Sequence, residues 1–473
     1  MSERVLIRGG SIVTAESVTR ADVLVSGERI QAIGDGSTWA HDRAIDASAC
    51  LVLPGGVDAH THLESPSDGF TTRTADDFYT GTVAAAFGGT TTVIDFVKAE
   101  PGRGIYESYQ RRKEAASKRC IIDFAFHPVV PVTACEDDSF DQLLRLAKDG
   151  ATSWKFFMAY PGTMMVDDRV LVHGFRACAE NGLLPMVHAE NGHMIADITE
   201  RLAAAGMLAE HFHTHAHPPI AEREAVSRAV AIAELTSSAL FVVHVSSRFA
   251  AEEIARARER AQPVFGETCP QYLLACYEDY ADTGFEAARY LCSPPIRERD
   301  NQEYLWRFLQ NRTLVTIGTD HACFMMAQPA DLPPQKPRGR GNFRRVPNGV
   351  PGIEERLLVM YEAGVISGRI DLRRMVELVS TRPARLFGLY PRKGTIAPGA
   401  DADIVVWDPK REQVISAANQ HSRVDYSLYE GMRISGSPMH VLSRGKLIIS
   451  DGQLNAEQGQ GQYLACGTPD TSL

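Results

Sequence analysis

The stretch that decides the fold is Val57-Asp58-Ala59-His60-Thr61-His62, an apolar run that ends in two histidines. Eight strand-like runs of this kind follow one another, beginning near Val57, Thr90, Ile121, Ala151, Leu184, Ala239, Gln262 and Thr313. The first five are 33, 31, 30 and 33 residues apart, the length of one strand plus one helix, and helix-periodic segments such as 75–87 and 222–235 fill the gaps. Eight parallel strands alternating with helices predict an α/β fold, and the count favours a (β/α)8 TIM-like barrel over a doubly wound sheet.

The two ends of the chain differ from this strand-and-helix pattern. Short β-rich runs bounded by glycines fill the first fifty residues, and similar runs return between Asp403 and Ile449. Neither end is long enough to form a good core alone, so we expect a small β-sandwich domain built from both. The predicted domains are 1–53 and 391–456 for the sandwich, 54–390 for the catalytic barrel, and 457–473 for a flexible tail.

Composition excludes several classes of protein. The 473 residues are 44% hydrophobic and 23% charged, which is typical of a globular protein. The net charge of −10 argues against binding to nucleic acid or an anionic membrane, which needs a basic surface. Nine cysteines occur without a CxxC pair, and no apolar stretch approaches the length that spans a bilayer. We therefore expect a soluble, cytoplasmic protein with reduced thiols.

Polar residues of metal-ligand type stand where the predicted strands end. His60 and His62 share one face of their strand, because residues two apart point to the same side. His188, His244 and Asp320 each follow a later apolar run. The carboxyl ends of barrel strands meet at one face, where such enzymes carry their chemistry. Four imidazoles and a carboxylate suit zinc or a similar borderline metal.

Lys155 lies at a fifth strand end, among the aromatic residues Trp154, Phe156 and Phe157. A bare ammonium is costly in an apolar interior and has no lone pair with which to bind a metal. Carboxylated by carbon dioxide, it would become an anionic carbamate able to bridge two ions. The alternative is a structural lysine whose ammonium reaches out of the barrel end.

Several motifs in fixed order resemble the dihydropyrimidinase/D-hydantoinase family of the amidohydrolase superfamily, from about Val5 to Gly461. The matching stretches are Gly55–His62, Trp154–Tyr160, Val187–Gly192, Gly266–Leu273, His244–Ser247, Gly318–His321, Pro347–Glu354 and Leu386–Pro391. The resemblance implies zinc-dependent hydrolysis of the cyclic amide bond of hydantoins or dihydropyrimidines. It also implies a homo-oligomer, tetramer or dimer, acting on a small molecule.

The resemblance further implies two Zn²⁺ ions per subunit. One would be held by His60, His62 and Asp320, the other by His188 and His244, with carboxylated Lys155 and a hydroxide bridging them. Zinc lowers the pKa of bound water to about 7, so a hydroxide is available at neutral pH. Asp320 would take the proton of the attacking hydroxide and pass it to the departing amide nitrogen.

Substrate contacts are implied for five residues. Tyr160 matches the tyrosine that hydrogen-bonds the developing oxyanion, which requires the strand of Lys155 to end near Met158. Ser293 and Asn348 match positions whose backbone groups bind the ring amides. We expect the loops 63–70 and 157–166, and in particular Leu63 and Phe157, to contact the ring substituent.

Two other functions compete with this interpretation. A dihydroorotase or allantoinase would act on a related ring, but dihydroorotase-like enzymes carry an arginine soon after the second histidine, where this chain has Leu63 and Glu64. We expect Glu64 and Asp68 to repel an anionic substrate. A non-catalytic dihydropyrimidinase-related scaffold would have lost metal ligands, whereas all six positions are intact here.

Four further features depart from the family pattern or lack an assigned role. Pro161 replaces a common basic residue, and His217 replaces an arginine. The tract 211–217 alternates histidines, which we interpret as a surface connection before Pro218. We interpret a basic cluster in the segment 336–345 as a solvated loop near the barrel mouth.

Overall fold

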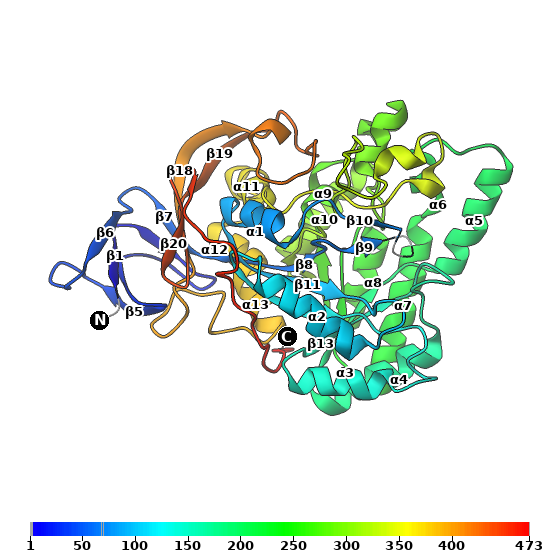
Figure 1. Ribbon diagram of the computed structural model, residues 1–473, viewed down its shortest axis with the longest axis horizontal. Coiled ribbons are helices and arrows are strands. Elements are labelled where there is room, and N and C mark those ends of the chain that lie inside the picture. Colours follow the sequence, from blue (N-terminus) through cyan, green and yellow to red (C-terminus); the bar gives the residue numbers. More distant parts are fainter. Residues whose placement is uncertain (1–2, 68, 70, 473) are drawn as a thin grey trace.

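In the computed structural model, which describes residues 3–67, 69 and 71–472, parallel strands and their helices form one body, with the strands of both chain ends beside it (Figure 1). The eight parallel strands are β8 (Gly56–Thr61), β11 (Thr90–Val97), β12 (Asp123–Pro128), β13 (Ser153–Phe157), β14 (Leu184–His188), β15 (Leu240–Val242), β16 (Val264–Thr268) and β17 (Leu314–Ile317). Each begins within two residues of its predicted position.

Their hydrogen-bonded pairing follows barrel order with two interruptions. Three strands pair in the order β12-β11-β8 and five in the order β13-β14-β15-β16-β17. An isolated parallel bridge between Val129 and Lys155 connects β12 to β13, and one between Thr61 and His321 connects β8 to the chain after β17. The strands therefore succeed one another as predicted, but not as one continuously hydrogen-bonded sheet.

Helices separate the strands along the chain, as the spacing predicts. They are α1 (Phe78–Phe87), α2 (Ile105–Ser117), α3 (Ser139–Lys148), α4 (Asp168–Asn181), α5 (Gly192–Ala204), α6 (Phe212–Ala216), α7 (Pro219–Thr236), α8 (Arg248–Glu259), α9 (Pro270–Leu274), α10 (Asp300–Gln310), α11 (Arg356–Met360), α12 (Leu372–Val376) and α13 (Arg382–Leu386). None of these described helices has the length and apolar character needed to cross a bilayer.

The chain ends form two more sheets, on the left of Figure 1. One has the order β5-β4-β1-β6 and the other β21-β20-β19-β18-β7-β2-β3. Their strands are β1 (Arg4–Arg8), β2 (Ser11–Val13), β3 (Val18–Arg20), β4 (Asp22–Ser26), β5 (Arg29–Gly34), β6 (Arg43–Asp46), β7 (Leu51–Pro54), β18 (Ile404–Val414), β19 (Arg433–Ser443), β20 (Lys446–Ser450) and β21 (Gln453–Leu454). Buried residues of both sheets, such as Val25 and Ile404, belong to one apolar cluster.

A buried ion cluster attaches these sheets to the parallel strands. The ammonium of Lys393 lies 2.7 Å from Asp123 at the start of β12 and 2.6 Å from Asp403 beside β18. Arg444, which follows β19, contacts the other carboxylate oxygen of Asp123 at 3.0 Å. Two cations thus share one carboxylate where the two parts of the fold meet.

The C-terminal segment differs from the expected flexible tail. Residues 457–472 run along the barrel, where Leu464 is fully buried and its N–H donates to the carbonyl of Phe124. Cys466 and Gly467 hydrogen-bond to Gly150 and Gly388. Glycines and small polar residues suggested disorder, but here they allow close backbone approach: a Cβ on Gly461 would lie 2.0 Å from the carbonyl oxygen of Ile122.

Side chains join the first barrel strand to the last. Thr319, just after β17, donates its hydroxyl to Asp58 of β8 at 2.7 Å. Arg356 is fully buried and donates to the carbonyls of Val57 in β8 and Ile317 in β17, both at 3.0 Å. Its Nε lies 3.7 Å from Asp58, which is also fully buried. This polar seam, defined as Asp58, Thr319 and Arg356, links β8 and β17 where regular pairing is absent.

We predict that Arg356→Met destabilises the fold by about 3–5 kcal/mol, because Asp58 would remain as a buried charge without its cation. Urea unfolding followed by circular dichroism measures this change. The control is Arg223→Met on the exposed face of α7, which should leave the midpoint unchanged. Equal midpoints for Arg356→Met and the wild type would contradict the role of the seam.

Candidate metal centre

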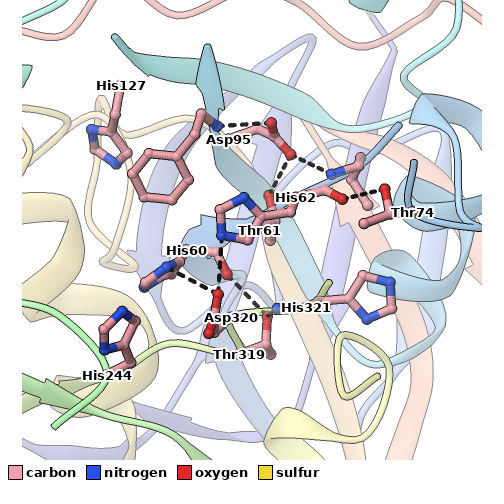
Figure 2. A network of polar contacts seen from close by, with 12 residues as sticks. His60, Thr61, His62, Thr74, Asp95, His127, His244, Thr319, Asp320 and His321 are labelled. Atoms are coloured by element: carbon pink, nitrogen blue, oxygen red, sulfur yellow. Dashed lines mark hydrogen bonds and ion pairs between the residues drawn. The ribbon is translucent and has the colours of Figure 1, made fainter. Parts of the chain in front are cut away.

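Asp320 lies between His60 of β8 and His62, which directly follows β8. Its Oδ1 atom is 3.2 Å from Nε2 of His60 and 3.0 Å from Nε2 of His62 (Figure 2). The ligand atoms of these three residues lie within 4.8 Å of one another. Two strand ends that are 258 residues apart in the chain thus supply one candidate binding site for a cation.

The remaining predicted ligands lie beside this group of three residues. The rings of His60 and His244 are 5.4 Å apart, and those of His244 and His188 are 4.6 Å apart. The ammonium of Lys155 is buried above the rings of Phe96 and Phe157. All six predicted ligands line a single cavity of about 630 Å³.

Two buried carboxylates orient the imidazoles from behind. Glu267 of β16 lies 2.6 Å from Nδ1 of His60, and Glu190 lies 2.8 Å from Nε2 of His188. Carboxylates in this position fix the ring and raise the basicity of the nitrogen that faces a metal. The sequence analysis gave neither glutamate a role, although Glu267 is, like the ligands, a polar residue at a strand end.

The backbone is left-handed at three of the predicted site residues. Tyr160, His244 and Asp320 have φ values of 66°, 40° and 50°. Such values cost energy for non-glycine residues and persist where surrounding contacts enforce them. β13 ends at Phe157, so the condition set for Tyr160 is met, and its side chain lines the cavity.

Most protonation states at the site suit metal binding. Burial opposes ionisation of Asp320, but His60 and His62 hold the pKa of this carboxyl well below its usual range. Burial lowers the pKa of Lys155 to about 7 and that of His244 well below its normal value. Nδ1 of His244 is buried without a hydrogen-bond partner among the described residues. Burial opposes protonation of His60, but Glu267 and Asp320 raise its pKa to about 9, so a metal ion would displace a proton there. Burial lowers the pKa of His62 and His188. Imidazoles, an ionised carboxylate and an unpaired buried nitrogen form a donor set that fits a borderline divalent metal.

Four of the five residues expected to contact substrate line the cavity, and one does not. Phe157, Ser293 and Asn348 line the cavity, and Nδ2 of Asn348 donates to the Ser293 hydroxyl at 3.3 Å. Leu63 does not: it is fully buried in the core against α1, so close to Gly81 that a Cβ there would lie 2.2 Å from its Cδ2. The turn after His62 directs Leu63 inward, and the loop presents Ser65 to the cavity instead.

Two other expectations about this region were wrong. Glu64 does not face the cavity but forms ion pairs with Arg73 and Arg119; Asp68 and Phe70 of the same loop lie outside the described residues. The histidine tract is not merely a surface connection. His217 is buried with Nδ1 2.9 Å from Glu190, and Nε2 of His213 lies 2.8 Å from the carbonyl of Cys292.

A second group of potential ligands, Asp76, His321 and Cys323, is a hydrogen-bonded network instead. Asp76 lies 3.1 Å from Nε2 of His321 and accepts a hydrogen bond from the thiol of Cys323. Nδ1 of His321 accepts hydrogen bonds from the backbone N–H groups of Gly352 and Ile353. Neither ring nitrogen is therefore free to bind a metal. These bonds anchor the loop that carries Asp320.

Comparison with known proteins agrees with this geometry. The profile of the Amidohydrolase family matches residues 51–448. The chain belongs to this family. A D-hydantoinase of Streptomyces coelicolor is 44% identical over 99% of both chains. The solved structure of a D-hydantoinase from Bacillus sp. AR9 is 43% identical to this chain and superposes with a TM-score of 0.93. The solved structure of a dihydropyrimidinase from Brevibacillus agri is 41% identical and superposes with a TM-score of 0.94. Each match covers 98% of this chain and 99% of the solved chain.

This amidohydrolase therefore has the TIM-barrel fold of its relatives and lies in their hydantoinase/dihydropyrimidinase branch. Amidohydrolases are metal-dependent enzymes, and the polar strand ends of this chain meet in its main cavity as that chemistry requires.

We predict that Glu190→Gln weakens metal binding about 10- to 100-fold, because a neutral amide polarises His188 less than a carboxylate does. The metal content after dialysis against graded chelator measures the loss independently of activity. Glu200→Gln, on exposed α5, is the control and should retain metal like the wild type. Identical retention in both variants would remove Glu190 from the metal centre.

Proposed function

We propose that the chain is a zinc-dependent hydantoinase/dihydropyrimidinase, which hydrolyses the amide bond of a five- or six-membered cyclic amide. The D-hydantoinases and dihydropyrimidinase that match over nearly the whole chain support this activity. The observation that carries it is the convergence of four histidines, Lys155 and Asp320 on one cavity. The same convergence argues against a non-catalytic scaffold.

We propose that His60, His62 and Asp320 hold one zinc ion and His188 and His244 the other, with carboxylated Lys155 between them. Two zinc ions would supply a hydroxide nucleophile at neutral pH. Burial supports the carbamate, because a carboxylated Lys155 replaces a desolvated ammonium with a group that metal ions can bind.

Asp320 is proposed as general base and then general acid. Its carboxylate can accept the proton of the attacking hydroxide and return it to the amide nitrogen as the ring opens. The hydrogen bonds from the loop network hold Asp320 in its left-handed conformation, so the carboxylate needs no reorganisation during the transfer.

The remaining residues bind the ring. The hydroxyl of Tyr160 is proposed to donate to the carbonyl oxygen as negative charge develops on it. Backbone groups of Ser293 and Asn348 bind the ring amides, and the buried Oδ1 of Asn348, which lacks a partner among the described residues, offers an additional acceptor. Phe157 contacts the ring substituent.

We propose a two-part organisation for the chain. The apolar cluster shared by the two terminal sheets supports a β-sandwich domain from residues 1–53 and 391–456 beside a barrel of residues 54–390. The scattered free cysteines are consistent with a cytoplasmic enzyme. A homotetramer or homodimer follows from the family resemblance alone.

We expect two zinc ions per chain in protein purified without chelator, and fewer in Lys155→Ala, because the bridging anion is lost. Turnover of hydantoin should disappear in this variant, and added acetate or propionate should restore a trace of it by occupying the vacated space. Elemental analysis and a hydantoin ring-opening assay provide the two measurements. Full activity and metal content in Lys155→Ala would show that Lys155 is only structural.

Asp320→Asn should lower kcat by at least about 10²–10⁴-fold, because the amide cannot accept the hydroxide proton. Ring binding should survive better than turnover, so the inhibition constant of a non-hydrolysable cyclic amide is measured beside kcat. Asp425→Asn, a substitution on a loop outside the cavity, is the control. An Asp320→Asn enzyme within a few-fold of the wild type would exclude the proton-transfer role.

A further inference from the structure

The mouth of the active-site cavity carries positive charge that the proposed reaction does not use. Lys98, which follows β11, and Arg344 and Arg345, from the short turn 343–345, all line the cavity. Among the described lining residues, the only Asp or Glu is Asp320, which is occupied with His60 and His62. This distribution contrasts with a chain whose net charge is −10.

These cations differ in how strongly other groups engage them. Arg344 pairs with Glu200 at 2.7 Å, and Lys98 donates to the carbonyl of Pro66 at 2.9 Å. Arg345 is exposed, and no described carboxylate pairs with its guanidinium. Arginine at such a position presents a planar set of donors that matches a carboxylate. Arg345 is therefore the best-placed group to bind an anion at the mouth.

Apolar side chains lie elsewhere on the wall of the cavity. Val129, Val130 and Val132 follow β12, Phe157 ends β13, and Met164 follows it. A volume of about 630 Å³ falls within the usual range for small-molecule sites and leaves space beyond the ring for a long substituent. Such a wall fits an apolar stem.

The orientation of Glu64 removes one of the two carboxylates that were expected to repel an anionic ligand; the other, Asp68, lies outside the described residues. The Glu64 carboxylate is neutralised by Arg73 and Arg119 in a neighbouring cavity, away from the metal centre. The described charges that face the mouth therefore attract an anion, which is the opposite of the repulsion that the sequence suggested.

We propose that the enzyme selects cyclic amides whose ring substituent is an apolar stem ending in an anionic group, and that Arg345 binds this anion with support from Arg344 and Lys98. The inference rests on the proposed hydantoinase function and names its substrate class. Arg345 acts as a specificity-determining residue and takes no part in ring opening.

The test compares 5-(4-carboxybenzyl)hydantoin with 5-(4-carbamoylbenzyl)hydantoin, which have the same shape and differ in charge. We expect kcat/KM to favour the acid about fivefold, the size of one charge interaction at an exposed site. The preference should arise from KM and shrink when salt is raised from about 0.05 to 0.5 M, because ions screen exposed charges.

Arg345→Gln should bring the acid-to-amide ratio of kcat/KM close to one, and Arg345→Lys should restore part of the preference. Arg223→Gln, an exposed arginine on α7, should keep the wild-type ratio. An equal ratio in wild type and Arg345→Gln would overturn the inference, as would a wild-type enzyme that prefers the amide. If the wild type hydrolyses neither compound nor unsubstituted hydantoin and dihydrouracil, the proposed function itself fails.

Discussion

The metal centre depends on the contact between the first and last strands of the barrel. His60 lies in β8, His62 directly follows it, and Asp320 lies in the chain after β17, so their convergence requires the two strand ends to lie side by side. Regular pairing does not join these strands, and buried side chains do so instead. Burying Arg356 and Asp58 is costly in itself, but removing one would leave the other uncompensated. The charges therefore specify which strands meet.

Around this seam, the site is built in layers. The ligands line the cavity, Glu190 and Glu267 hold two of the imidazoles, and His217 holds Glu190 in turn. In a low-dielectric interior buried polar groups are hydrogen-bonded, and these bonds restrict rotation of the His60, His188 and His217 rings. Glu267 also accepts the backbone N–H of His244, where the backbone is left-handed.

Substrate discrimination depends on the loops, not on the strands. The strand ends supply the candidate metal ligands, whereas the segments after β11, β12 and β13 and the turn 343–345 supply the wall and the mouth. Because loops are the most variable connections of a barrel, they can change the charge of the mouth without disturbing the metal ligands. The cationic mouth of this chain is built from such segments.

The amino-acid sequence alone determined the strand order and the polar strand ends, because strand period and βα spacing are local properties. The condition that the strand of Lys155 end near Met158 is met, and Tyr160 lines the cavity. Tertiary structure decided the direction of Leu63 and Glu64, the burial of His217 and the docking of residues 457–472. Each of these depends on a turn conformation or on a partner distant in the chain, and neither leaves a periodic signal. Left-handed backbone and buried hydrogen bonds arise only when the elements pack together, so the orientation of loop side chains could not be read before the fold was known.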